Sequence, residues 1–505
     1  MDLFDFLMWN MMRKLFYIVV FAVLANCAMA QIFGESAVNY NAGIIDENNY
    51  IQNMFAYTPM GGGTQVLHNY SYKRETEFQK IFEDGTWNAW GGGTAWVNHP
   101  LQASKTLPNG TTVQAPTQND YAYGASIWGQ TGRIGGFSLG AQISVANPWF
   151  ADNMNGAFQY GYYGTMPSAP ENALNQLYVE YQYENKVQAD VGWITINESP
   201  WLVPAAALGH IMPAAAYQGG QVSVYAGGGW ILHGIAFNAA QLIGQSGFTG
   251  MNFYNSPAGY GNGLIPDAPN SSSSGTVALG ANYKALNNNL NVRLWGYSFQ
   301  NYSNLLYADS SLDMHATDTV KFNVSTQIGN SSGNSATNGL TSSVGVNPQV
   351  NSDQISSNIA GAMASVTIDW AQIGAAYTTM WGPEGSFGNG QFVSPYTPAI
   401  NTDPIFSNSW NYNNIAVNSA TSQGIKAFTK FTFLDGNLWI NPTYATYTNT
   451  SPQWNGTQEW DLMTSYSIPQ VKGLNIFNVL IYEIMPASNP SPTLFSTQVV
   501  LGYTY

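Results

Sequence analysis

Hydrophobic and polar residues alternate with a period of two along several short stretches of the chain. In residues 177–183 the odd positions are apolar or aromatic and the even positions are largely polar, and the alternation resumes in residues 187–191. The same pattern flanks a turn at residues 287–289 and precedes a turn at residues 435–436. A period of two that is broken by polar turn residues predicts β-hairpins with one apolar and one polar face. In all three regions the apolar residues do not recur at the intervals of three and four residues that an amphipathic helix requires.

The connections between these hairpins indicate how the sheet closes. Short Asn-, Gly- and Asp-containing turns alternate with long Ser-, Asn-, Gly- and Pro-rich connections, which we expect over residues 147–174, 252–275, 307–358 and 381–420. Short turns at one end and long loops at the other are typical of outer-membrane barrels. Aromatic residues at strand ends suit the aromatic girdles of such a barrel, namely Tyr181, Tyr183, Trp193, Tyr283 and Trp295. The sequence therefore predicts an all-β fold, a transmembrane antiparallel β-barrel with long extracellular loops.

The end of the chain supports the same prediction. Tyr505, Tyr503, Leu501 and Val499 alternate with more polar or smaller residues, and the chain stops on an aromatic residue. Such a final amphipathic strand resembles the recognition sequence of outer-membrane barrels. We interpret Tyr505, Tyr503 and Leu501 as a C-terminal signal for the barrel-assembly machinery.

The first 30 residues have the organisation of an export signal. Arg13 and Lys14 precede the apolar run 15–24, and an A-x-A site predicts cleavage between Ala30 and Gln31. The only cysteine, Cys27, lies inside this signal, so a lipoprotein signal acylated at Cys27 is the weaker alternative, and a transmembrane anchor would need a longer apolar run. The true start is Met1 or a later methionine, Met11 or Met12. We expect a signal peptide at 1–30, a periplasmic extension or plug at 31–65, and the barrel at 66–505.

Composition excludes several classes of protein. Only 8% of the 505 residues are charged, against about 25% in an average soluble domain. The formal net charge of −14 argues against a nucleic-acid partner, and the 14% aromatic content argues against disorder. A charge-poor surface avoids positive self-repulsion when carboxylates protonate in acid, which suggests an acid-living Gram-negative bacterium. Selection for uncharged solutes is the alternative explanation.

The sequence gives little indication of a catalytic or cofactor-binding site. The five histidines are scattered, there is no H-E-x-x-H or Walker motif, and we expect neither a metal site nor a cofactor. A hydrolase with a Ser-His-Asn arrangement around His233 is the least favoured class, because nothing in the sequence marks a serine partner. We therefore expect no enzymatic activity.

Several segments resemble the OprD-type outer-membrane porin family. They include the early strand 66–74, the hairpin 124–140, the ordered segments 177–200, 210–213 and 218–219, the region 280–312, and residues 459–462 and 471–476 near the end. The order of these loosely matching pieces, across roughly 66–505, carries the resemblance. It implies a barrel of 18 strands, narrowed by an inward-folded constriction loop. It also implies a passive channel for small solutes, often carboxylates, that is a monomer or a trimer among outer-membrane lipid and lipopolysaccharide.

The chain departs from the family in its basic residues, because only 12 of them follow the signal and a long arginine ladder cannot be built. Alternation places the pore-lining candidates opposite the apolar face, namely Arg293, Lys426, Lys430, Lys284, Glu180 and Asp190. The arginine of the family's constriction motif falls on His210, which predicts a constriction that becomes cationic below a pKa of about 6.5. Isolated lumen charges and a loop histidine without a role are the alternatives for these residues.

These sequence features are compatible with two functions. The favoured one is a porin that allows passive diffusion of small hydrophilic solutes or ions. The alternative is a barrel whose lumen is plugged, with residues 31–65 as one source of the plug, and whose long loops bind external surfaces.

Overall fold

The computed structural model describes most of the chain after residue 80. The described residues are 81–82, 84–102, 104–114, 117–151, 170–196, 199–202, 216–241, 247–250, 275–287, 289–300, 303–333, 355–383, 386, 392, 404–410, 422–450, 454–489 and 493–504. The predicted signal, the extension 31–65 and the expected early strand 66–74 lie outside this set.

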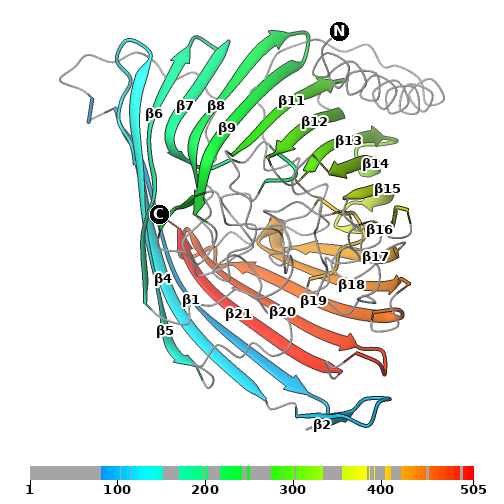
Figure 1. Ribbon diagram of the computed structural model, residues 1–505. Helices are drawn as coiled ribbons and strands as arrows, with labels where there is room; N and C mark the ends of the chain where they lie inside the picture. Colours follow the sequence, from blue (N-terminus) through cyan, green and yellow to red (C-terminus); the bar gives the residue numbers. More distant parts are fainter. Residues whose placement is uncertain are drawn as a thin grey trace.

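Eighteen of the described strands form one closed antiparallel sheet (Figure 1). They are β1 (Thr86–Pro100), β4 (Gln118–Gln130), β5 (Phe137–Ala151), β6 (Glu171–Tyr183), β7 (Val187–Ile194), β8 (Ala216–Gly227), β9 (Trp230–Gln241), β11 (Thr276–Ala285), β12 (Leu290–Phe299), β13 (Ser303–His315), β14 (Val320–Gly333), β15 (Ser356–Ile368), β16 (Ala371–Trp381), β17 (Ser422–Phe433), β18 (Leu438–Thr448), β19 (Thr457–Ser467), β20 (Leu474–Ile484) and β21 (Leu494–Thr504). The short β10 (Thr249–Gly250) pairs with β9, and β2 (Ser104–Thr106) pairs with β3 (Thr112–Gln114) as a separate hairpin. A 3-10 turn, η3, spans Leu434–Gly436.

The barrel closes where its first and last strands meet. β1 pairs with β4 on one side and with β21 on the other, with Trp90 opposite Thr504 and Pro100 opposite Leu494. The other wall strands pair in chain order, and β9 and β11 pair directly beside the short β10. The predicted all-β barrel and its strand number are therefore confirmed. Within the described ranges, no helix is long and apolar enough to cross a bilayer.

Alternation along each strand separates the two faces of the wall. In β6, Leu177 and Val179 are 50% and 42% exposed, whereas Tyr178 and Glu180 are 2% and 3% exposed. Successive side chains of a strand point to opposite faces, so the exposed apolar set faces outward and the buried set faces the lumen. In β21, Val499, Leu501 and Tyr503 are exposed in the same way, as the C-terminal pattern predicts, while Tyr505 lies beyond the described residues.

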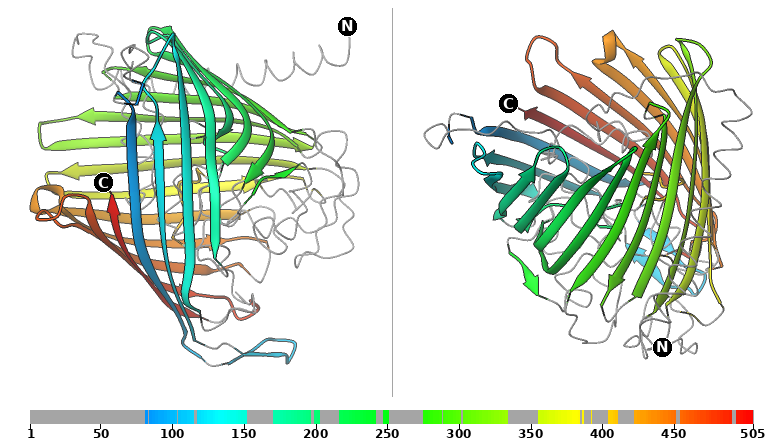
Figure 2. Two further views of the ribbon diagram at one scale, coloured as in Figure 1. Left: turned by 90° about the vertical axis from the view of Figure 1, so that its left-hand side faces the viewer. Right: turned by 90° about the horizontal axis from the view of Figure 1, so that it is seen from above.

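The two ends of the barrel differ as expected (Figure 2). The end that carries Thr86 and Thr504 has short turns, such as residues 184–186, 228–229 and 369–370. The other end carries the longer connections, including those between β5 and β6 and between β16 and β17.

The prediction of one long loop, over residues 307–358, is wrong. The connection assigned to 307–358 contains most of β13, a turn at 316–319 and all of β14. β13 and β14 carry hydroxyls on the outward face, where Ser310 and Thr326 hydrogen-bond each other at 2.8 Å. Hydroxyls that pair across strands satisfy one another, so Ser310 and Thr326 fit on the same face as the apolar pair Leu312–Val324, and the apolar alternation is interrupted there.

Candidate functional site in the barrel lumen

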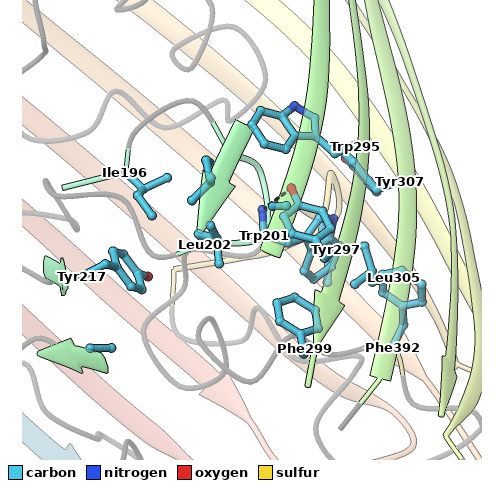
Figure 3. Close-up of a cluster of buried hydrophobic side chains, with 14 of the residues drawn as sticks. Ile196, Trp201, Leu202, Tyr217, Trp295, Tyr297, Phe299, Leu305, Tyr307 and Phe392 are labelled. Carbon is cyan, nitrogen blue, oxygen red and sulfur yellow. Dashed lines mark hydrogen bonds between the residues drawn. The ribbon is translucent and has the colours of Figure 1, made fainter. Parts of the chain in front are cut away.

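The lumen contains a cluster of buried aromatic side chains that come from both the wall and a connection (Figure 3). Trp201, from the connection between β7 and β8, contacts Tyr307 at 5.5 Å and Phe392 at 5.0 Å between ring centroids. Both ring pairs are edge-to-face, a geometry that aromatic rings favour. The segment 199–202 therefore enters the lumen and packs on β13.

A column of stacked rings on the wall supports this segment. Trp295, Tyr297 and Phe299 all face inward from β12 and stack at 5.8 and 5.5 Å, and His233 of β9 stacks on Trp295 at 5.5 Å. The assignment of Trp295 to an outer aromatic girdle is wrong, because it lies fully buried on the inward side of β12. Its own alternation gives the reason, since Trp295 lies two residues from the inward-facing Arg293.

The hydroxyl of Tyr297 links the column to the inward segment. It accepts hydrogen bonds from Ser199 Oγ at 2.9 Å and from the main-chain N–H of Trp201 at 3.3 Å. A buried hydroxyl with two donors fixes the position of the segment, because leaving any of these groups unpaired would cost free energy.

A second segment, residues 404–410, is held in the lumen by polar groups of the wall. Gln327 of β14 donates to the Pro404 oxygen at 3.0 Å and accepts from the Phe406 N–H at 2.9 Å. The Tyr447 hydroxyl of β18 donates to the Ser407 oxygen at 2.9 Å and accepts from the Ser409 N–H at 2.9 Å. Sequence reasoning missed this segment, because its wall partners lie on strands that are distant in the chain.

One charged candidate, Lys426, and one carboxylate that was not predicted, Asp461, complete this attachment. Lys426 of β17, which is fully buried, donates to the Asn408 oxygen at 3.1 Å. Asp461 of β19 accepts from the Trp410 N–H at 3.1 Å. Lys426 therefore faces the lumen as alternation predicts, but it contacts the backbone of an inward segment.

The other basic candidates also face the lumen. Arg293 forms a two-bond ion pair with Asp309, directly opposite on β13, at 3.0 and 2.7 Å. Lys430 lies 5.4 Å from the centre of the Trp439 ring. Lys284, at the end of β11, is half-buried. The ion pair of Arg293 is of the bidentate kind that carboxylates form with guanidinium groups.

The acidic candidates lie opposite each other on neighbouring strands. Glu180 of β6 faces Asp190 of β7, and both are buried. Glu180 forms an ion pair with Arg133 and accepts from Gln188 Nε2 at 3.0 Å, while Asp190 accepts from Gln221 Nε2 at 2.9 Å. Arg133, from the connection between β4 and β5, is thus a buried lumen cation that the sequence analysis did not single out.

Three further carboxylates, not predicted from the sequence, gather on the opposite wall. Glu459 of β19 lies opposite Glu483 of β20, and Asp461 interacts with both of them and with Lys426. All three are buried on the inward face. Among the described residues, no group of three or more His, Cys, Asp or Glu side chains has the arrangement of a metal site.

His233 does acquire the neighbours that a hydrolase would need. Ser223 Oγ lies 2.9 Å from its Nδ1, and Asn282 Nδ2 lies 3.0 Å from its Nε2. All three residues belong to paired strands, whose main-chain N–H groups serve the sheet and do not form an oxyanion hole. The spacing G-x-S-x-G occurs at 136–140, in the turn before β5 and its first residues, and at 329–333 within β14, but neither site has the strand-to-helix turn of a nucleophile elbow.

The remaining predicted sites lie outside the described residues. These are the constriction candidate His210, the cleavage site Ala30–Gln31 and the terminal Tyr505.

Comparisons with known proteins agree with the architecture. No family model and no curated protein match the chain. Among solved structures, Pseudomonas aeruginosa OccK8 (OprE) superposes with a TM-score of 0.64 at 14% identity, covering 84% of this chain and 99% of that one. Acinetobacter baumannii OccAB3 gives 0.61 at 11% identity, covering 84% and 100%. P. aeruginosa OpdK, solved with vanillate, gives 0.60 at 13% identity, covering 84% and 99%. The chain therefore has the fold of the OprD-type outer-membrane porins that its sequence resembles.

Proposed function

We propose that this protein is an outer-membrane porin, a passive diffusion channel for small hydrophilic solutes. The observation that carries the proposal is a closed barrel with an apolar outer face and a polar inner wall, narrowed by segments 199–202 and 404–410. Closure leaves no unpaired strand edge, as a bilayer requires of a spanning sheet. The long connections would then face outside and the short turns the periplasm.

Conductance of the refolded chain in a planar bilayer tests this proposal. Stable single-channel steps at neutral pH and at pH 4 are the expected result. Bilayers that stay silent with protein that is demonstrably folded, as judged by heat-modifiable migration, would contradict it.

The lumen charges support a preference for uncharged solutes over carboxylates. Arg133 and Arg293 are each neutralised by a carboxylate, and Lys426 contacts a main-chain oxygen. Paired cations attract anionic solutes less than a row of unpaired ones, so this wall differs from the arginine ladder that the family resemblance implies. We expect liposomes that contain the protein to swell faster in a neutral sugar than in a carboxylate of similar size. Faster swelling in the carboxylate would refute this preference.

The other predicted sites are part of the proposal. Lys284, Lys430, Glu180 and Asp190 would line the lumen, and His210 would confer pH dependence on the constriction. A His210→Ala variant whose conductance keeps the wild-type pH profile would exclude that role.

Export and assembly have their own tests. The proposed mature chain begins at Gln31, which the intact mass of the exported protein would reveal. Removing Tyr505 or replacing Tyr503 and Leu501 by serine should slow insertion by the assembly machinery, relative to serine at the inward-facing Val500.

A plugged barrel with surface-binding loops is the second candidate. The aromatic cluster around Trp201 and Phe392, which is buried within the lumen, favours it. Silent bilayers from folded protein would support this candidate and direct attention to the long loops.

A further inference from the structure

His233 joins three strands of the inner wall through both of its ring nitrogens. Its Nδ1 lies 2.9 Å from Ser223 Oγ of β8, and its Nε2 lies 3.0 Å from Asn282 Nδ2 of β11. The Asn282 side chain continues the chain of contacts to β12, because its Oδ1 accepts from Trp295 Nε1 at 3.4 Å. The Trp295 ring also stacks on the imidazole, with 5.5 Å between centroids. These four side chains therefore form one connected group around a buried histidine.

The stack across β11 depends on Gly280. This residue lies opposite His233 on one side and opposite Trp295 on the other, and a Cβ on it would overlap the indole ring. Because Gly280 has no side chain, the indole lies across β11 and reaches both the imidazole and the Asn282 amide. A glycine inside a strand thus marks a close approach of side chains from the two neighbouring strands.

The chain of contacts fixes where the hydrogens lie. An indole nitrogen only donates, so the Asn282 atom that faces it is the amide oxygen, and the amide nitrogen then faces His233. An amide nitrogen also only donates, so Nε2 of His233 carries no hydrogen and its Nδ1–H donates to Ser223 Oγ. The imidazole is therefore neutral in this arrangement.

Protonation of His233 is incompatible with the same arrangement. An imidazolium donates from both ring nitrogens, so its Nε2–H would face the N–H of the Asn282 amide. Turning the amide over would repair that contact, but it would place the amide N–H against the Trp295 N–H. In either orientation one buried donor loses its acceptor, which costs free energy.

The charged groups nearby leave Asn282 as the neighbour that must adapt. Arg293, opposite Asn282, is paired with Asp309, and Asp190 accepts from Gln221 Nε2 at 2.9 Å. Both carboxylates are thus engaged by other donors, and the tyrosines stay neutral throughout the acid range. The inward-facing charged or titratable residues of the neighbouring described strands are Asp190 of β7, Tyr225 of β8, Lys284 of β11, Arg293 and Tyr297 of β12, and Tyr307 and Asp309 of β13.

Trp295 connects this group to the inward segment 199–202. Its ring stacks on Tyr297 at 5.8 Å between centroids, and the two rings lie next to each other below Trp201 (Figure 3). The Tyr297 hydroxyl accepts from Ser199 Oγ and from the Trp201 N–H. A displacement of the indole therefore reaches the attachment of the segment through one further ring.

We propose that His233 is an acid-sensing positioning residue, whose protonation breaks the Asn282–Trp295 hydrogen bond and loosens the hold of Tyr297 on segment 199–202. The inference rests on the proposed porin function, because it assigns that channel a width that acid increases. The neutral imidazole keeps the segment attached, and the imidazolium releases it.

Asn282→Asp tests the relay at constant pH. A carboxylate only accepts hydrogen bonds and attracts a cation, so it would accept from Nε2–H and stabilise the imidazolium at neutral pH. His233→Gln removes the titrating ring, and a double variant combines the two changes. Asn291→Asp is the matched control, because it adds a carboxylate to the same inner wall, opposite Lys284. All variants carry His210→Ala, so that no titration at that position contributes, and His210→Ala alone is the parent.

Nitrogen NMR of isotope-labelled histidine in detergent micelles reads the state of the ring directly. The His233 signals are those that His233→Gln lacks. At pH 7.5 we expect a hydrogen on Nδ1 and a bare Nε2 in the parent and in Asn291→Asp, and hydrogens on both nitrogens in Asn282→Asp. A bare Nδ1 in the parent, or unchanged His233 signals in Asn282→Asp, would overturn the proposal.

Single-channel recording tests the effect on the segment. Asn282→Asp should carry at pH 7.5 the larger open-state current that the parent carries only at pH 5, whereas the double variant should keep the small current at both pH values. A parent current that does not change with pH would overturn the proposal. A double variant that keeps the larger current would do the same, because the new carboxylate would then act through Arg293. A barrel that gives the expected NMR signals but never conducts would contradict only the porin function.

Discussion

The ammonium group of Lys426 donates a hydrogen bond to the main-chain oxygen of Asn408, 3.1 Å away. This contact joins β17 to the segment 404–410 inside the lumen. A residue chosen as a lining cation is therefore an attachment point for a constricting segment, and this difference changes what its substitution should do.

Replacing Lys426 by methionine should release segment 404–410 and widen the channel. A hydrogen bond to a charged group is worth about 1.5–3 kcal/mol, so the population of released segment should rise roughly tenfold or more. Single-channel recording should show a larger conductance and more current fluctuation. Lys430→Met, beside Trp439, is the control. A shift in ion selectivity at unchanged conductance would instead show that Lys426 acts as a lining cation.

Tyr297→Phe tests the other inward segment. The substitution removes the hydroxyl that accepts from Ser199 and from the Trp201 N–H but keeps the stacked ring. The loss should weaken the attachment of residues 199–202 by about 1 kcal/mol and increase the open-state current. Tyr307→Phe is a milder comparison, because the hydrogen bond that the Tyr307 hydroxyl donates to the Pro404 oxygen is long, at 3.4 Å. An unchanged current for Tyr297→Phe would show that this segment does not limit conduction.

Asp309→Ala should leave Arg293 as a buried cation without its carboxylate. Breaking a buried ion pair from one side typically costs about 3–5 kcal/mol. We expect a lower midpoint of urea unfolding in detergent micelles and a shift of selectivity toward anions. The double variant Arg293→Met, Asp309→Leu should recover most of the stability and lose the selectivity shift. If Asp309→Ala unfolds at the wild-type midpoint, the Arg293–Asp309 ion pair contributes little to stability.

Lys105 gives a pH-dependent prediction outside the barrel wall. It lies in β2 and donates to the Pro486 oxygen at 2.7 Å, and burial lowers the pKa of its ammonium group below the usual 10.5. Between the two pKa values the unfolded state binds more protons than the folded state, so stability should rise with pH in the window just below 10.5.

The difference in unfolding midpoint between wild type and Lys105→Met, measured from pH 8 to 11, isolates this contribution. As the pH rises, the unfolding midpoint of wild type should increase relative to that of Lys105→Met. A difference that stays constant over that range would contradict the lowered pKa. The turn residue Lys186, whose exposed ammonium pairs with Glu184 at 2.6 Å, offers a comparison in which the pKa shift is upward.

Local pattern determined which residues form strands and which way each side chain points. The hairpin at 177–191 and the strand before Asp435 have one apolar face each, and the period of two places Arg293, Lys426 and Glu180 in the lumen regardless of what they meet there. This information is available from sequence because it depends only on neighbouring residues and on the medium that each face contacts. It failed at 307–358, where the Ser310–Thr326 pair interrupts the apolar residues of the outward face.

Only the tertiary structure determined which residues contact each of these lumen charges. Arg293 meets Asp309 because β12 and β13 pair in one register, and Glu180 of β6 meets Arg133 because the β4–β5 connection places Arg133 beside it. Lys426 meets Asn408 because a segment between β16 and β17 enters the barrel. Register and the path of a connection depend on contacts between distant parts of the chain. The composition of a strand therefore determines its faces, whereas closure of the barrel determines whether a lumen charge is paired, buried or used as an anchor.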